Sequence, residues 1–202
     1  MGVCMGGKAD EILSKEGGVV LIEYPSLSHP ERAFARIVEG FRGRGIRPLI
    51  VDVFDTLHIF FQNLRFAGVE IDLGDIPVIK ERGFVKVGNV LGSVEVIEDF
   101  EYHLALYSSI ARKVPEESRR HTIVLGVEKF AFPFMEEPPK LERYFETVQR
   151  RYLQLVDKTN FLFLNTDVAS EYLKKGLEQD SDYVFRVEKG KLYPVKTIQE
   201  GV

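Results

Sequence analysis

An apolar run followed within a few residues by a helix start places strong limits on how this chain can fold. Residues 19–22 (VVLI) form the run, which is typical of a parallel strand covered on both faces. Residues 28–31 (SHPE) follow with a capping-box pattern and a proline in the first helical turn. A strand that enters a helix through a short loop is where α/β proteins usually bind phosphate. Residues 18–36 therefore predict a strand–loop–helix unit with Ser28 as the helix cap.

Strand patterns alternate with helical patterns along the rest of the chain. Residues 70–97 carry short alternating runs separated by glycines, which predict strands with tight turns. Lys189-Gly190 is the predicted turn of a C-terminal β-hairpin. The alternation predicts a three-layer α/β fold with a mainly parallel sheet. Further core strands are expected at 47–54, 121–127 and 160–165, and helices at 8–15, 30–42, 56–67, 99–114, 141–155 and 167–177.

The whole chain is expected to form one domain. Residues 1–202 contain no linker, internal repeat or low-complexity tract, although residues 1–8 are expected to be a loose tail. Within the predicted helices, Gly176 is expected to end the helix that begins near Asp167. The helix at 99–114 is expected to pack inward through Leu104, Tyr107, Ser108 and Ala111.

Charge and cysteine content limit the partners and the compartment. The net charge of −4 and the pI of about 5.7 argue against a general attraction to nucleic acid or anionic membranes. Cys4 is the single cysteine, so an internal disulfide is excluded and a reducing cytoplasm is expected. No apolar run reaches the roughly 20 residues that cross a bilayer. The abundance of Glu, Lys and Arg is typical of thermophiles.

The element order and the run VLIEYPSLSHPERAFA resemble the core of RecA/KaiC-type ATPases. In that family the first strand–loop–helix carries the phosphate-binding P-loop. The resemblance implies a RecA-like fold and side-by-side assembly, which is common among these proteins. The chain is also similar to an uncharacterised archaeal family of Pyrococcus and Thermococcus that shares the altered loop.

The P-loop pattern G-x-x-x-x-G-K-[ST] finds none of its four fixed residues here. Its two glycines fall on Tyr24 and His29, which are expected to tolerate positive φ poorly. Its lysine falls on Pro30, which has neither an ammonium group nor a backbone N–H. Its hydroxyl residue falls on Glu31, whose carboxylate would repel phosphate. The loop is therefore not expected to work as a P-loop.

The acidic residues of the ATPase family are missing as well. The strand expected at 121–127 has Gly126 where the family holds an aspartate near magnesium, and Glu128 follows as an expected surface residue. The catalytic carboxylate of KaiC-like proteins follows the second strand, where Asp55 stands in this chain. We interpret Asp55 as a helix cap, so that no catalytic residue is predicted.

Two other groups of residues are candidates for binding. Ser26, Ser28 and Arg32 surround the first helix start and could hold a nucleotide in an atypical way. A second group is apolar and lies in a predicted loop, where it must either cover the sheet or meet another chain. This group comprises Phe130, Phe132, Phe134 and Met135. The four histidines lack metal-ligand spacing, and no metal or other cofactor is predicted.

These observations favour a non-catalytic RecA/KaiC-like domain that acts through protein contacts, as a homo-oligomer or with a protein partner. One alternative is an atypical nucleotide-binding protein that uses residues 24–32. A second alternative is a DNA-associated accessory factor, because the resembled family works on DNA.

Overall fold

One eight-stranded sheet, in the order β4-β3-β2-β5-β6-β1-β7-β8, forms the centre of the protein. The computed structural model describes residues 17–95, 99–134, 136–150 and 157–197; the predicted tail at 1–8 and helix at 8–15 lie outside them. The first seven strands in this order are parallel, and β8 is antiparallel to β7. The strands are β1 (Gly18–Tyr24), β2 (Leu49–Val53), β3 (Pro77–Glu81), β4 (Asn89–Val94), β5 (His121–Leu125), β6 (Thr159–Asn165), β7 (Tyr183–Glu188) and β8 (Lys191–Lys196).

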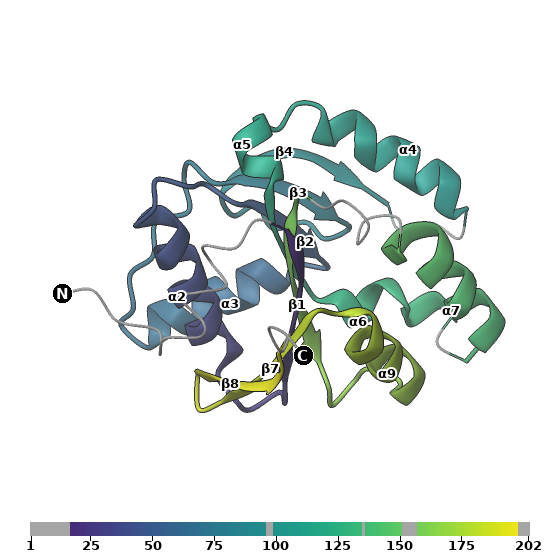
Figure 1. Cartoon of the computed structure of the whole chain (residues 1–202). Helices are drawn as coiled ribbons and strands as arrows, with labels where there is room; N and C mark the ends of the chain where they lie inside the picture. Colours follow the sequence, from purple (N-terminus) through teal and green to yellow (C-terminus); the bar gives the residue numbers. More distant parts are fainter. Residues whose placement is uncertain (1–16, 96–98, 135, 151–156, 198–202) are drawn as a thin grey trace.

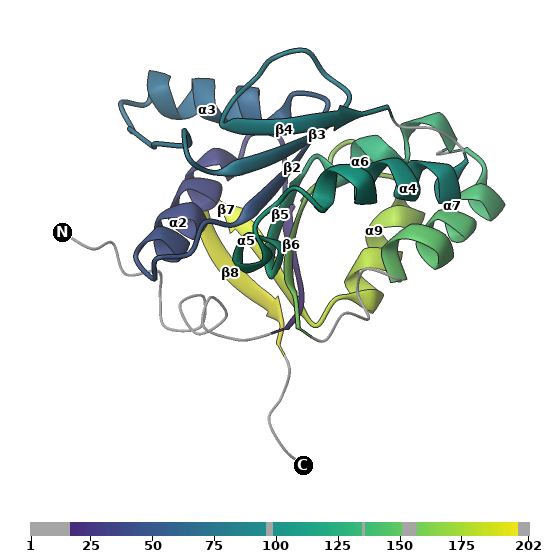
Figure 2. The same cartoon turned by 90° about the horizontal axis from the view of Figure 1, so that it is seen from above.

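Helices cover both faces of the sheet and complete the three predicted layers (Figures 1 and 2). One face carries α2 (Pro30–Arg42) and α3 (Thr56–Phe66). The other face carries α4 (Phe100–Ala111), α6 (Val127–Phe130), α7 (Pro138–Tyr144) and α9 (Glu171–Asp180). The short helix α5 (Glu116–Arg119), the 3₁₀ turn η1 (Phe132–Phe134) and the π-helix η2 (Phe145–Gln149) complete the described elements.

The apolar run at residues 19–22 lies in β1, near the middle of the sheet, as predicted. β1 pairs with β6 on one side and with β7 on the other, so side chains on both of its faces are buried. Val20 and Ile22 pack beneath α2 and α3, whereas Val19 and Leu21 face the helices of the opposite layer. A strand covered on both faces reads as a continuous apolar run, which is why the sequence signal was strong.

The predicted C-terminal hairpin is confirmed, and its turn adopts left-handed backbone at Lys189 (φ 48°) and Gly190 (φ 76°). The prediction for residues 70–97 was partly wrong. β3 and β4 form there, but they are parallel neighbours, and residues 84–88 connect them without forming a strand. This connection is much shorter than the helical crossover that usually joins parallel strands.

Two helix predictions need correction. The last helix begins after Ser170, whose hydroxyl accepts a hydrogen bond from the N–H of Leu173, and Gly176 lies inside it. A Cβ at Gly176 would lie 2.7 Å from the ring of Phe145, so glycine is needed there for helix packing and not for a helix end. The helix predicted at 141–155 is interrupted by the π-helical turns of η2. No helix in the described ranges is long and apolar enough to cross a membrane.

Candidate functional site

The β1–α2 loop joins a buried strand to the N-terminus of a helix, and its capping arrangement differs from the one predicted. His29 occupies the N-cap position of α2 in the left-handed region, with φ 60° and ψ 54°, so the expectation that histidine would resist positive φ was wrong. The prediction that Ser28 caps the helix was also wrong. The Ser28 hydroxyl donates to the carbonyl oxygen of Pro25 at 2.7 Å. Tyr24 ends β1, and its ring packs against Phe60.

A carboxylate from the chain itself occupies the N-terminus of α2. The Glu31 side chain is 4% exposed, and its Oε1 lies 3.0 Å from Nδ1 of His29. Negative charge is stabilised at a helix N-terminus because the unpaired N–H groups there carry partial positive charge. Glu31 therefore places a buried carboxylate in the first turn of α2.

The tip of the C-terminal hairpin packs against the same loop. The N–H of Gly190 donates to the Ser28 carbonyl at 2.7 Å, and Arg36 donates to the Gly190 carbonyl at 2.9 Å. A Cβ on Gly190 would lie 2.9 Å from Cβ and Cδ of Arg32, so the Arg32 stem lies directly on the hairpin. Ser26 is held from the other side, since its N–H donates to Asp167 at 2.8 Å. The three predicted binding residues Ser26, Ser28 and Arg32 are thus close in space, but each contacts the protein itself.

A buried lysine joins two aspartates at the carboxyl ends of β2 and β3. The Lys80 ammonium donates to Asp52 and to Asp55, each at 2.6 Å, and the Lys80 side chain is 3% exposed. Burial alone would lower the pKa of Lys80, but the hydrogen bonds and charges of the two aspartates raise it. Burial would likewise raise the pKa of Asp55, yet the bond from Lys80 and the N–H groups of Phe84 and Val85 lower it.

The interpretation of Asp55 as a helix cap was therefore wrong. Asp55 stands at the N-cap position of α3, but its side chain makes no capping bond and faces Lys80 and the β3–β4 connection. Asp52 does the capping instead, because its Oδ1 accepts from the N–H of Leu57 at 2.8 Å. The Asp52–Lys80 pair was missed, although two opposite charges inside apolar strands were a usable signal. The two residues stand directly opposite each other in the β2–β3 register.

Glu128 was predicted to lie on the surface, and this was wrong as well. Its side chain is buried, and its Oε2 accepts the N–H of Asn165 at 3.1 Å. Burial raises the pKa of Glu128, and the bond from Asn165 only partly offsets this. The neighbouring Lys129 donates to the Thr56 hydroxyl at 2.7 Å. In the described part of the chain no three His, Cys, Asp or Glu side chains are placed to hold a metal ion.

The aromatic segment after β5 is divided between core and surface. Phe134 is buried and packs edge-on against Phe100, and Phe130 is half-buried. Phe132 is exposed, and Met135 lies outside the described residues. Of the three described candidate interface residues, Phe132 is the most exposed, at 46%.

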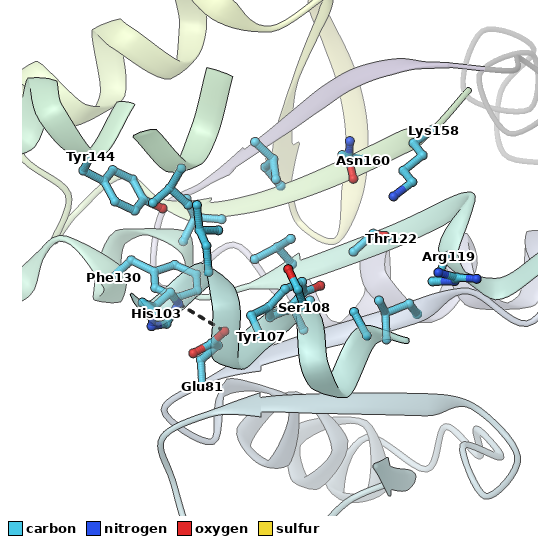
Figure 3. A pocket seen from close by; sticks show the side chains of 18 of the residues that line it. Glu81, His103, Tyr107, Ser108, Arg119, Thr122, Phe130, Tyr144, Lys158 and Asn160 are labelled. Carbon is cyan, nitrogen blue, oxygen red and sulfur yellow. Dashed lines mark ion pairs between the residues drawn. The ribbon is translucent and has the colours of Figure 1, made fainter. Parts of the chain in front are cut away.

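A cavity of about 390 Å³ lies on the sheet face opposite α2, between strands β2, β5 and β6 on one side and helices α4, α5, α6 and α7 on the other (Figure 3). Sequence reasoning did not identify it. The four α4 residues expected to pack inward, Leu104, Tyr107, Ser108 and Ala111, all line this cavity. The pattern thus marked the correct side of α4, but it could not show that a space lies beneath the helix.

Glu81 and His103 form a buried ion pair at one end of the cavity, with Oε1 and Nε2 3.5 Å apart. Burial raises the pKa of Glu81, and the hydrogen bond and charge of His103 only partly offset it. Burial alone would lower the pKa of His103, but Glu81 and the Glu95 carbonyl outweigh this and raise it. Both groups therefore hold a proton more tightly in the folded protein than in the unfolded chain.

This pair predicts a specific dependence of stability on pH. Stability from His103 is present below its unfolded pKa of about 6.5 and is lost as pH rises through the raised folded pKa. Glu81 acts in the same direction above its ordinary pKa of 4.5, because folding then costs the energy of a buried charge. We expect the wild type to lose stability relative to a Glu81→Gln, His103→Gln double variant as pH rises from about 5 to about 8. Urea denaturation at several pH values measures this; a constant difference would contradict it.

Solved structures of archaeal proteins share the fold. The chain is similar to the Pyrococcus horikoshii OT3 protein PH0250 with a TM-score of 0.78 and 21% identity, covering 96% of this chain and 93% of that one. It is similar to the KaiC-like protein PH0186 of the same organism with a TM-score of 0.51 and 13% identity, covering 85% and 71%. It is also similar to the flagellar accessory protein FlaH of Methanocaldococcus jannaschii, with a TM-score of 0.50 and 11% identity, covering 97% of this chain and 87% of that one.

These likenesses confirm the predicted RecA/KaiC-like fold. No curated protein matches the sequence. A family model described as "Pyrococcus protein of unknown function, DUF257" matches residues 13–200. The chain therefore belongs to the DUF257 family of Pyrococcus proteins.

Proposed function

We propose that this protein is a nucleotide-independent member of the RecA/KaiC-like fold that acts through protein contacts, with a second copy of the chain as its partner. The buried Glu31 carboxylate at the N-terminus of α2 is the observation that supports independence from nucleotide. A phosphate placed there would meet this negative charge, and Pro30 offers no N–H to bind it.

The carboxylates around the loop support the same conclusion. Asp52 and Asp55 share the ammonium group of Lys80, so the charge that could attract a magnesium ion is partly compensated. The hairpin tip at Gly190 covers the side of the loop where Arg32 lies. Each feature of a nucleotide site is thus replaced by a contact within the protein.

Exposed apolar side chains support the second half of the proposal. The loop after β1 exposes Leu27, which is 92% accessible, and the connection after β3 exposes Phe84, which is 97% accessible. Phe132 and Val168, which follow β5 and β6, are also exposed. The carboxyl ends of parallel strands meet at one edge of a sheet. Leu27, Phe84 and Val168 each lie three residues after a strand end, so we expect them at the edge where the family would hold nucleotide. Large apolar groups gathered at one edge are typical of protein contact surfaces.

Light scattering over a range of protein concentrations tests both self-association and its independence from nucleotide. We expect a mass above that of the monomer, unchanged by magnesium and ATP, and a dissociation constant at least about tenfold weaker in a Leu27→Glu, Phe84→Glu double variant. Phe66→Glu is the matched control. Phe66 is 89% exposed but lies at the C-terminal end of α3, near the opposite edge of the sheet.

Two results would count against the proposal. A strict monomer at high concentration would remove the self-association. A saturable rise in unfolding temperature with magnesium and ATP, lost in Arg32→Ala, would favour the atypical nucleotide site at Ser26, Ser28 and Arg32 instead.

A further inference from the structure

The cavity beneath α4 has an aliphatic middle. Leu49 and Val51 of β2, Val124 of β5 and Leu162 of β6 form its floor, and Leu104 of α4 lies among the residues that cover it. A space of about 390 Å³ equals the volume of about thirteen water molecules at roughly 30 Å³ each. Protein interiors are normally close-packed, and cavities of this size fall in the range of small-molecule binding sites.

Positive charge is concentrated at one end of the cavity. Figure 3 places Arg119 and Lys158 at the end away from Glu81 and His103, together with the polar side chains of Thr122 and Asn160. Arg119 Nε is buried and has no hydrogen-bond partner in the described part of the chain. Its neighbour Arg120, in contrast, is exposed and pairs with Glu116. A buried N–H donor without an acceptor is costly, so this end is suited to an anion.

The Lys158 ammonium gives a second, independent sign of uncompensated charge. Burial lowers the pKa of Lys158, and the positive charge of Arg119 lowers it further. Two cations that repel each other at the end of an apolar cavity would both be stabilised by one carboxylate between them. Arg112, which follows α4 and is exposed, also lines the cavity.

We propose that this cavity binds an amphipathic carboxylate, with its aliphatic chain between α4 and the sheet and its carboxylate at Arg119 and Lys158. The buried Glu81–His103 pair, with Phe130 and Tyr144, closes the opposite end. The π-helical turns of η2 form part of the wall through Val148, and such turns are frequent at functional sites. The cavity lies on the other face of the sheet from α2, so the inference does not depend on the proposed self-association.

Titration with a series of fatty acids below their micellar concentrations tests the proposal. We expect saturable binding of octanoate, decanoate and dodecanoate by calorimetry, with a rise in unfolding temperature for each. Each added methylene should tighten binding by about three- to fourfold until the chain fills the cavity. Decyltrimethylammonium, with a similar chain but a cationic head, should bind at least about tenfold more weakly than decanoate.

Two variants identify where the ligand lies. An Arg119→Gln, Lys158→Met double variant should weaken decanoate binding by more than about tenfold. The matched control, Arg120→Gln with Lys113→Gln, removes two nearby exposed charges outside the cavity lining and should bind normally. Ala111→Trp should block binding by filling the space, whereas Ser109→Trp on the exposed side of α4 should not.

Urea denaturation of each unliganded variant checks that it folds before its binding is compared. Absence of saturable binding by all three acids would overturn the proposal. So would equal affinity for the cationic amphiphile, or unchanged decanoate binding in the folded Arg119→Gln, Lys158→Met variant.

Discussion

Replacing Lys80 with methionine is expected to lower the free energy of unfolding by about 3 kcal/mol. The change removes the ammonium group that bonds to Asp52 and Asp55 and leaves the Asp52 carboxylate, 1% exposed, without the cation that bonds to it. Breaking a buried ion pair costs about 3–5 kcal/mol, and the lower end applies because Asp55 is 21% exposed. For a chain of this length the loss corresponds to a fall in unfolding temperature of roughly 6–12 °C.

Arg82→Met is the matched control for this prediction. Arg82 bonds to Glu95 at the surface, where both side chains are exposed, and such pairs contribute about 0–1 kcal/mol. Restoring charge balance should recover part of the loss, so Lys80→Met combined with Asp52→Asn is expected to be more stable than Lys80→Met alone. Equal losses for Lys80→Met and Arg82→Met in denaturant titrations would show that the buried cluster is not a major source of stability.

Gly126→Asp is expected to destabilise the protein by about 2–3 kcal/mol and to confer no affinity for magnesium and ATP. The change puts back the acidic residue that ATPases of this fold carry after the corresponding strand. Gly126 has φ 82°, and a Cβ there would lie 2.5 Å from the Thr56 hydroxyl and 3.1 Å from the Val53 carbonyl oxygen. The aspartate would therefore be strained, and we expect no magnesium ion bound to nucleotide phosphate beside it.

Gly43→Ala provides the comparison for this change. Gly43 has a right-handed backbone, with φ −59°, and the nearest atom to an added Cβ is at 3.4 Å. Alanine there should leave stability unchanged or raise it by about 0.4–1 kcal/mol. A Gly126→Asp variant as stable as Gly43→Ala in urea would show that the turn after β5 does not require glycine.

The fold could be predicted because its signals are local. Buried parallel strands such as β1 and β6 are continuous apolar runs, and a glycine-containing pair such as Lys189-Gly190 is typical of a tight hairpin turn. The connection between β3 and β4 was harder to predict, because a parallel pair joined by a short connection has the same local sequence pattern as a series of strands with tight turns.

The site was predicted only where a residue type excludes a function. Pro30 and Glu31 do not fit the P-loop pattern wherever neighbouring elements lie, so the sequence alone predicts that this loop does not work as a P-loop. The buried contacts of Asp55 and Glu128 depend on Lys80 and Asn165, which lie 25 and 37 residues further along the sequence. The cavity depends on how far α4 stands from the sheet, and a periodic pattern carries no information about that distance.

The position of β1 has a consequence for the order in which the chain can fold. β1 is made first among the described strands, yet Gly18 pairs with Thr159 and Val20 pairs with Tyr183. During synthesis its apolar side chains and both rows of backbone groups must wait until the last part of the chain emerges. Contacts this distant in sequence slow folding and prolong the time during which aggregation-prone apolar segments are exposed. β1 is thus synthesised first among the described strands but is among the last of them to be paired.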